Sequence, residues 1–169
     1  GTLVDEWVTL KADSTMMSCI VDALAAKGYT QTGADTGYIS EINGIKEKDA
    51  SKDSGWMGTL NDWFTSEGFA KYTVANGKLK SGDEIAVQHT CNLGADIGGS
   101  FDTSDKSLKA IALSAGELIP AFSSDVHDYT MILPEGVTAL TVTPTASNKQ
   151  NRVRIYVGGT EYGRKDAIP

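Results

Sequence analysis

The clearest periodicity in the chain is helical and lies near its start. Asp13 or Ser14 is placed to cap the free N–H groups at the beginning of this helix, and Gly28 follows as a C-terminal stop. Between them an apolar stripe recurs at three- and four-residue spacing: Met17, Ile20, Val21 and Leu24. The pattern predicts one amphipathic helix.

Alternation of apolar and polar residues predicts strands on both sides of this helix. Residues 3–10 and 84–91 alternate, and 38–42 leads into Asn43-Gly44, a strong tight-turn signal. Residues 56–60 form a further strand candidate. One helix followed by several strands predicts an α+β domain over residues 1–100, with the helix packed across a mixed sheet in a β-grasp-like plan.

The remainder of the chain carries no helical pattern. A glycine-rich run, residues 94–100, separates the halves and places the boundary near residue 100. Beyond it, short apolar runs alternate with turn residues and predict a small β-sandwich over residues 101–169. These runs are 108–113, 129–133, 137–142 and 153–157.

The amino-acid composition supports this division into two halves and excludes some classes of binding partner. All three tryptophans and both cysteines precede residue 100, whereas all four prolines and all three arginines follow it. The 169 residues carry a formal net charge of −7, which argues against nucleic acid and anionic lipid as partners. No apolar stretch approaches the roughly 20 residues that span a bilayer, so we expect no membrane insertion.

Residues of about 4–92 resemble a known family. The segments that carry the likeness are 55–57, 60–64 and 79–85, that is Gly-Trp-Met, Leu-Asn-Asp-Trp-Phe and Leu-Lys-Ser-Gly-Asp-Glu-Ile. They are similar to an uncharacterised bacterial family that itself resembles the carboxy-terminal domain of transcobalamin and intrinsic factor. The resemblance implies a β-grasp-like fold. In the animal carriers this domain closes over one face of a corrinoid.

Residues of about 105–169 resemble the bacterial cadherin-like β-sandwich family. The carrying segments are 118–123, 125–129 and 133–137, a Leu-x-Pro-x-Phe run, a tyrosine and a Pro-x-Gly turn. The resemblance implies an all-β, cadherin- or immunoglobulin-like sandwich, a module of secreted and cell-wall proteins. The family continues with strands beyond a segment like 153–157, so this sandwich is expected to be incomplete.

The densest aromatic segment is the candidate ligand site. Residues 58–64 mix aromatic, polar and turn-forming side chains, as ligand platforms do. Packing of the aromatic side chains in the core is the alternative. If the chain binds a small molecule, a corrinoid or a glycan, the contacts predicted are Trp56, Asn61, Asp62, Trp63 and Phe64.

Catalytic chemistry finds little support in the sequence. His89 lies on an alternating strand face and is expected to be half-buried and structural, whereas His127 is expected in a solvated turn. Cys19 borders the helix stripe and Cys91 is expected to face that helix, so a disulfide and two buried free thiols both fit. We expect no cofactor.

Metal chemistry has one weak candidate, at the boundary. Asp96, Asp102 and Asp105 lie near the glycine-rich run and can be read as calcium ligands between modules or as solvated carboxylates. The second reading is the commoner one, so no metal site is predicted.

The sequence thus predicts a non-catalytic, extracellular or cell-wall-attached binding or adhesion module of a bacterial surface protein. Its predicted partners are a small-molecule or glycan ligand and the other modules of a parent protein. Two alternatives stay open: a purely structural spacer, and a domain that contacts cobalamin or another corrinoid.

Overall fold

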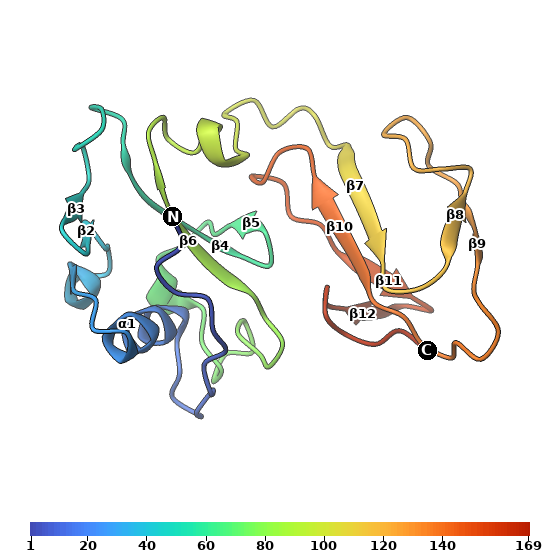
Figure 1. Cartoon of the computed structure of the whole chain (residues 1–169), viewed down its shortest axis with the longest axis horizontal. Coiled ribbons are helices and arrows are strands. Elements are labelled where there is room, and N and C mark those ends of the chain that lie inside the picture. Colours follow the sequence, from blue (N-terminus) through green and yellow to red (C-terminus); the bar gives the residue numbers. More distant parts are fainter.

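The computed structural model of the chain describes residues 1–169 and is mostly β, with one helix near the N-terminus (Figure 1). The helix packs on small antiparallel sheets, and the C-terminal region consists of two-stranded sheets. The elements are α1 (Met16–Ala26), β1 (Gln31–Thr32), β2 (Glu41–Ile42), β3 (Ile45–Lys46), β4 (Gly55–Leu60), β5 (Trp63–Phe64), β6 (Ile85–Thr90), β7 (Leu108–Leu113), β8 (Glu117–Ile119), β9 (Thr130–Ile132), β10 (Val142–Ala146), β11 (Ile155–Val157) and β12 (Thr160–Tyr162). Three 3-10 turns join them: η1 (Ala34–Thr36), η2 (Phe69–Lys71) and η3 (Ala95–Ile97).

The predicted helix is present, but its cap differs from the prediction. Thr15 is the N-cap: its hydroxyl accepts the Ser18 N–H at 2.9 Å, and the Thr15 N–H donates back to the Ser18 hydroxyl at 2.9 Å. This reciprocal pair satisfies two free helix-end groups at once. Ser14 instead closes the preceding turn, where its hydroxyl accepts the Lys11 N–H at 2.8 Å. Gly28 follows the C-cap at a φ of +76°, as predicted.

The main core lies beneath the apolar stripe of α1 and draws only on the first half of the chain. Burial of this stripe with side chains of β2, β4 and the η2 turn removes apolar surface from water and so stabilises the fold. The buried cluster contains Met16, Met17, Cys19, Ile20, Leu24, Ile39, Ile42, Trp56, Leu60, Tyr72 and Leu79.

Two three-stranded sheets surround this core in place of the single mixed sheet expected. One has the order β1-β2-β3, the other β5-β4-β6, and every pairing is antiparallel. The Asn43-Gly44 turn joins β2 to β3 as predicted, with φ of 50° and 82° at its two central residues. The predicted strands at 56–60 and 84–91 correspond to β4 and β6.

The strand predicted at residues 3–10 is wrong. These residues form no ladder, although Leu3, Val4, Val8 and Leu10 pack against the core. Trp7, on the other side of the segment, is 74% exposed. Most apolar residues of this segment therefore contribute to the core, but its backbone pairs with no strand.

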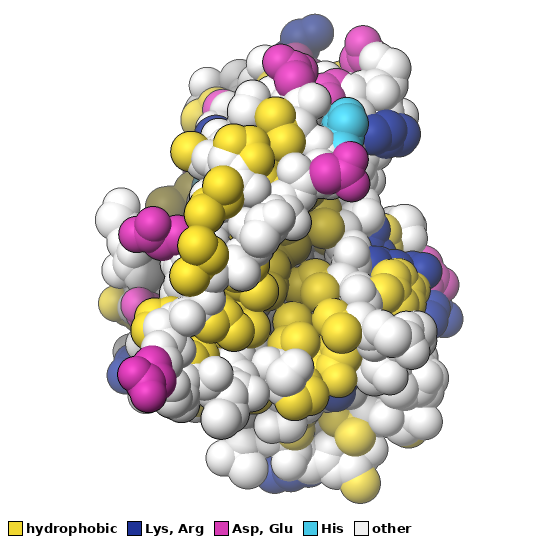
Figure 2. All heavy atoms as spheres, turned by 90° about the vertical axis from the view of Figure 1, so that its right-hand side faces the viewer, with side chains coloured by type: hydrophobic (Ala, Val, Ile, Leu, Met, Phe, Trp, Pro, Cys, Tyr) yellow, Lys and Arg dark blue, Asp and Glu magenta, His cyan; other side chains and the backbone are white.

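The second half contains β7 paired with β10, β8 with β9, and β11 with β12, all antiparallel. The prediction at 108–113 matches β7, whereas the strand expected at 137–142 begins only at Val142. Figure 2 shows apolar side chains gathered around a hollow on this side of the molecule. Large apolar residues stay exposed on β8, β9 and β11, among them Ile119, Ile132 and Val157.

The glycine-rich joint is ordered and packed. Gly94 and Gly98 flank η3 with φ of +91° and +99°, a region that favours glycine. A Cβ on Gly99 would lie 2.8 Å from the Phe64 ring, so the backbone needs a glycine to pass there. Asn148, which is buried, accepts the Ser100 N–H at 3.1 Å and donates to the Ser100 carbonyl at 3.1 Å, tying the joint to the second half.

Candidate functional site

A cavity of about 380 Å³ lies between the two halves of the chain. This volume falls at the lower end of the range of roughly 300–1,000 Å³ typical of small-molecule sites. The first half contributes the β4–β5 turn and residues 66–83; the second contributes the end of β10, residues 151–155 and residues 161–164. Neither half alone forms the site.

Trp63 and Tyr72 form the aromatic wall of this cavity. Their rings meet edge to face, with centroids 6.3 Å apart and an interplanar angle of 77°. The Trp63 indole N–H donates to the Gln150 carbonyl at 3.2 Å, which fixes the ring against the second half. The Arg152 guanidinium lies 5.1 Å from the Trp63 ring centroid, within reach of a cation–π interaction.

Charged side chains of both signs frame the cavity. Lys78 and Glu67 form its shortest ion pair, with Nζ 2.5 Å from Oε2. Their hydrogen bond lowers the pKa of the Glu67 carboxyl and raises the pKa of the Lys78 ammonium. Lys78 also lies 5.6 Å from the Tyr72 ring centroid. This corner of the cavity is therefore internally neutralised.

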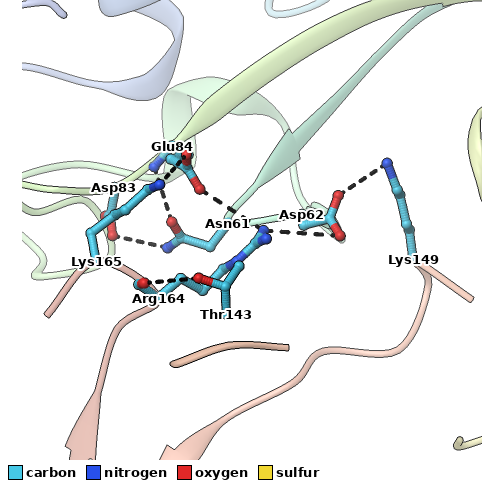
Figure 3. Close-up of polar contacts among 8 residues, drawn as sticks. All are labelled: Asn61, Asp62, Asp83, Glu84, Thr143, Lys149, Arg164 and Lys165. Atoms are coloured by element: carbon cyan, nitrogen blue, oxygen red, sulfur yellow. Dashed lines mark hydrogen bonds and ion pairs between the residues drawn. The ribbon is translucent and has the colours of Figure 1, made fainter. Parts of the chain in front are cut away.

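The turn between β4 and β5 holds its polar groups in place through the second half (Figure 3). Asp62 pairs with Lys149 at 3.0 Å and, at 3.9 Å, with Nη1 of Arg164. The Arg164 side chain is only 18% exposed, and its buried Nε has no hydrogen-bond partner. Asp62 thus anchors two cations of the second half, which leaves its carboxylate little capacity for a ligand.

The Asn61 amide, one of the predicted ligand contacts, is engaged within the protein. It donates to Asp83 Oδ1 at 2.9 Å, and its oxygen accepts the Glu84 N–H at 3.0 Å (Figure 3). Asn61 itself has a φ of +51°, in the left-handed region that asparagine tolerates. The geometry gives Asn61 the role of shaping the turn that presents Trp63.

The five predicted ligand contacts are divided between two hollows. Asn61, Asp62 and Trp63 line the cavity between the halves, whereas Trp56 and Phe64 are buried and line a second hollow of about 200 Å³. The ligand-platform prediction therefore maps onto the cavity only through its central three residues.

The remaining candidate residues lie outside the cavity lining. His89 is half-buried, with Nε2 3.1 Å from the Lys46 carbonyl and its ring edge to face with Trp56 at 5.1 Å. His127 is exposed on the second half. Cys19 and Cys91 are free thiols: Cys19 is buried, and burial raises the pKa of its thiol. Cys91 lies just after the end of β6 and is exposed, so it is neither bridged to Cys19 nor buried against the helix as expected.

The three linker carboxylates satisfy local turns. Asp96 accepts from the Thr90 hydroxyl and from the Cys91 N–H at 2.8 Å, and these bonds lower the pKa of its carboxyl. Asp102 and Asp105 accept backbone N–H groups two residues further on, from Ser104 and Ser107.

Sequence reasoning missed the cationic side chains of the cavity. Arg152, Arg154 and Arg164 all line it. The available signal was their clustering: every arginine of an acidic chain falls within thirteen consecutive residues, 152–164.

Comparison with known proteins finds a family match for part of the first half. Residues 13–88 match the family described as Domain of unknown function (DUF4430). The DUF4430 match contains α1, β4 and most of β6, and it confirms the expectation of an uncharacterised family in the first half. No curated protein and no solved structure matches the chain. The only α-helix of the fold is too short to cross a bilayer.

Proposed function

We propose that this chain is a non-catalytic ligand-binding or adhesion module of a secreted or cell-surface bacterial protein. The ligand is a small molecule or a glycan, and it binds in the cavity between the halves. One observation carries this proposal: Trp63, oriented by its bond to the Gln150 carbonyl and by Tyr72, lines a cavity bordered by polar side chains. An oriented aromatic face beside polar groups suits a sugar ring.

The surroundings of the two imidazoles support binding rather than catalysis. A general base must reach the proton that it removes, and neither His89 nor His127 lines the cavity. His89 is also held by the Lys46 carbonyl and the Trp56 ring. The proposed surface location rests on the family resemblances, which also suggest a β-grasp-like plan for residues 1–100 and a cadherin-like sandwich for residues 101–169.

A structural spacer is the second candidate, and the contacts between the halves favour it. The Phe64 N–H donates to the Lys149 carbonyl at 2.9 Å, and the Lys149 N–H donates to the Gly98 carbonyl at 2.9 Å. Backbone bonds of this kind fix the angle between the halves, as a spacer requires. Contact with a corrinoid is the third candidate. A corrin ring with its side chains is larger than this cavity, so only an edge of the ligand would enter.

Titration calorimetry with a glycan panel and with cobinamide tests the three candidates. A binding module predicts saturable binding to at least one glycan. Trp63→Phe should weaken that binding about tenfold, because the larger aromatic face contributes roughly 1–1.5 kcal/mol. Trp7→Phe, which removes an exposed tryptophan outside the cavity lining, is the matched control and should bind like the wild type. No binding to any glycan would contradict the proposal, and saturable cobinamide binding alone would favour the corrinoid alternative.

A further inference from the structure

The cavity gathers cations in a chain that is acidic overall. The chain has a net charge of −7, yet five cationic and four acidic side chains line the cavity. All three arginines of the chain are among the five. Cations concentrated in a recess of an acidic surface produce a local field that attracts anions.

Most of these cations are neutralised by a partner carboxylate. Lys78 pairs with Glu67 at 2.5 Å, Lys80 with Asp166 at 3.6 Å, and Arg154 with Glu161 at 3.8 Å. These pairs resemble ordinary surface ion pairs, and they leave little unmet charge at their positions.

Arg152 differs from them. It makes no ion pair within 4.0 Å and no side-chain hydrogen bond, and its one specific contact is a cation–π approach to Trp63, with Cζ 5.1 Å from the ring centroid. A cation–π contact uses none of the guanidinium N–H groups, so these donors have no partner in the protein. The structure thus presents a positioned cation with unsatisfied donors directly over the aromatic wall.

Arg164 supplies a second guanidinium with unmet donors. Its nearest carboxylates, Asp62 and Glu84, lie 3.9 Å from Nη1, beyond hydrogen-bond distance. Its buried Nε has no partner, although only 18% of the side chain is exposed. The head group is therefore held only by long ion pairs at Nη1, and its remaining terminal N–H groups can pair with a ligand carboxylate in the cavity that Arg164 lines.

We infer that the cavity binds a sugar that bears a carboxylate, with Arg152 as its principal anion contact and Arg164 as the second. This inference rests on the proposed binding function and names its ligand class. A guanidinium pairs with a carboxylate through two parallel hydrogen bonds, and the aromatic wall of Trp63 and Tyr72 contacts the sugar ring. The other three cations of the lining are each paired with a carboxylate, so these two guanidiniums are the ones left to meet an anion.

The test compares acidic sugars with neutral forms of the same size. Galacturonate is titrated against its methyl ester, and sialyllactose against its own methyl ester, with inorganic phosphate as a further arm. We expect the acids to bind at least tenfold more tightly than their neutral partners, with an affinity that falls as salt is raised. Arg152→Gln should remove most of this preference, and Arg152→Lys should restore only part of it.

Lys109→Gln is the matched control, because it also removes one positive charge from the second half, at an exposed residue of β7 outside the cavity lining. It should change the affinity less than threefold. Equal binding of acids and neutral forms, or an unchanged preference in Arg152→Gln, would refute the inference while the binding function stands. Phosphate binding tighter than either acid would also refute it. Failure of every acidic and neutral sugar to bind would refute both proposals.

Discussion

Gly58 occupies the middle of β4, where a side chain would collide with the core. A Cβ at this position would lie 2.4 Å from Cζ and 2.5 Å from Cε1 of Phe69, and 3.3 Å from Cε of Met16. Ordinary contacts begin at 3.4 Å, so the Phe69 ring would have to move by about 1 Å. The glycine therefore lets the ring pack directly over the strand that leads into the Trp63 turn.

Gly58→Ala should destabilise the protein. Overpacking of this kind costs about 1–3 kcal/mol, and the reduced entropy of the unfolded chain returns about 0.4–1 kcal/mol. With the middle value of each range, the net loss is about 1.3 kcal/mol, which for a chain of this length lowers Tm by about 3–5 °C. Urea unfolding followed by far-UV circular dichroism measures the free energy, and calorimetry measures Tm.

Two variants test whether the clash with Phe69 causes this loss of stability. Gly68→Ala is the control: Gly68 has a φ of −58°, its nearest neighbour across space is the Gly37 carbonyl oxygen at 3.7 Å, and stability should change by less than about 0.5 kcal/mol. Phe69→Leu removes the clashing ring atoms, so Gly58→Ala should cost much less in that background. A Gly58→Ala protein as stable as the wild type, or an equal loss in both backgrounds, would show that the clash does not govern this site.

Three further predictions concern the joint, one ion pair and the tryptophans. Asn148→Ala removes a buried side chain that accepts the Ser100 N–H and donates to two backbone carbonyls. The free energy of unfolding, measured by calorimetry, should fall by about 1–3 kcal/mol. The exposed control Ser147→Ala should lower it far less. The hydrogen bond from Lys78 holds the pKa of Glu67 below its ordinary 4.5. The ion pair therefore stabilises the fold at pH values above 4.5, and this stabilisation is lost as the pH falls through the pKa of Glu67 in the folded protein. In Lys78→Met, an NMR titration should show the pKa of Glu67 returning toward its ordinary value. Trp7→Phe should sharply reduce the quenching of tryptophan emission by acrylamide, because Trp7 is 74% exposed and Trp56 only 8%. Unchanged quenching in this variant would contradict the burial of Trp56.

The helix, the tight turn and several strands were predictable from the sequence, because each depends mainly on residues close together in the chain. The stripe from Met17 to Leu24, the Asn43-Gly44 turn and the apolar runs of β4, β6 and β7 each carry their own periodicity or turn chemistry. The central residues of the predicted aromatic segment line the cavity, since a local turn with positive φ at Asn61 and Asp62 places Trp63 there.

Features that depend on distant partners were not predictable in this way. Residues 3–10 alternate like a strand, but pairing requires an open edge that no local pattern reports. The three arginines and the end of β12 line the cavity only because residues 151–164 fold back against the β4–β5 turn, and no local pattern reports that contact. The ion pairs that join Asp62 to Lys149 and Arg164 are likewise separated by more than 80 residues in the sequence.

The division of the cavity wall between the halves has a mechanical consequence. The aromatic face belongs to one half and the arginines to the other, so an occupant that touches both acts as a reversible cross-link. At a concentration one hundred times its dissociation constant, such an occupant opposes separation of the halves by about 2.7 kcal/mol. Pulling on the two ends of the chain would then weaken ligand affinity, and ligand would raise the force at which the halves part.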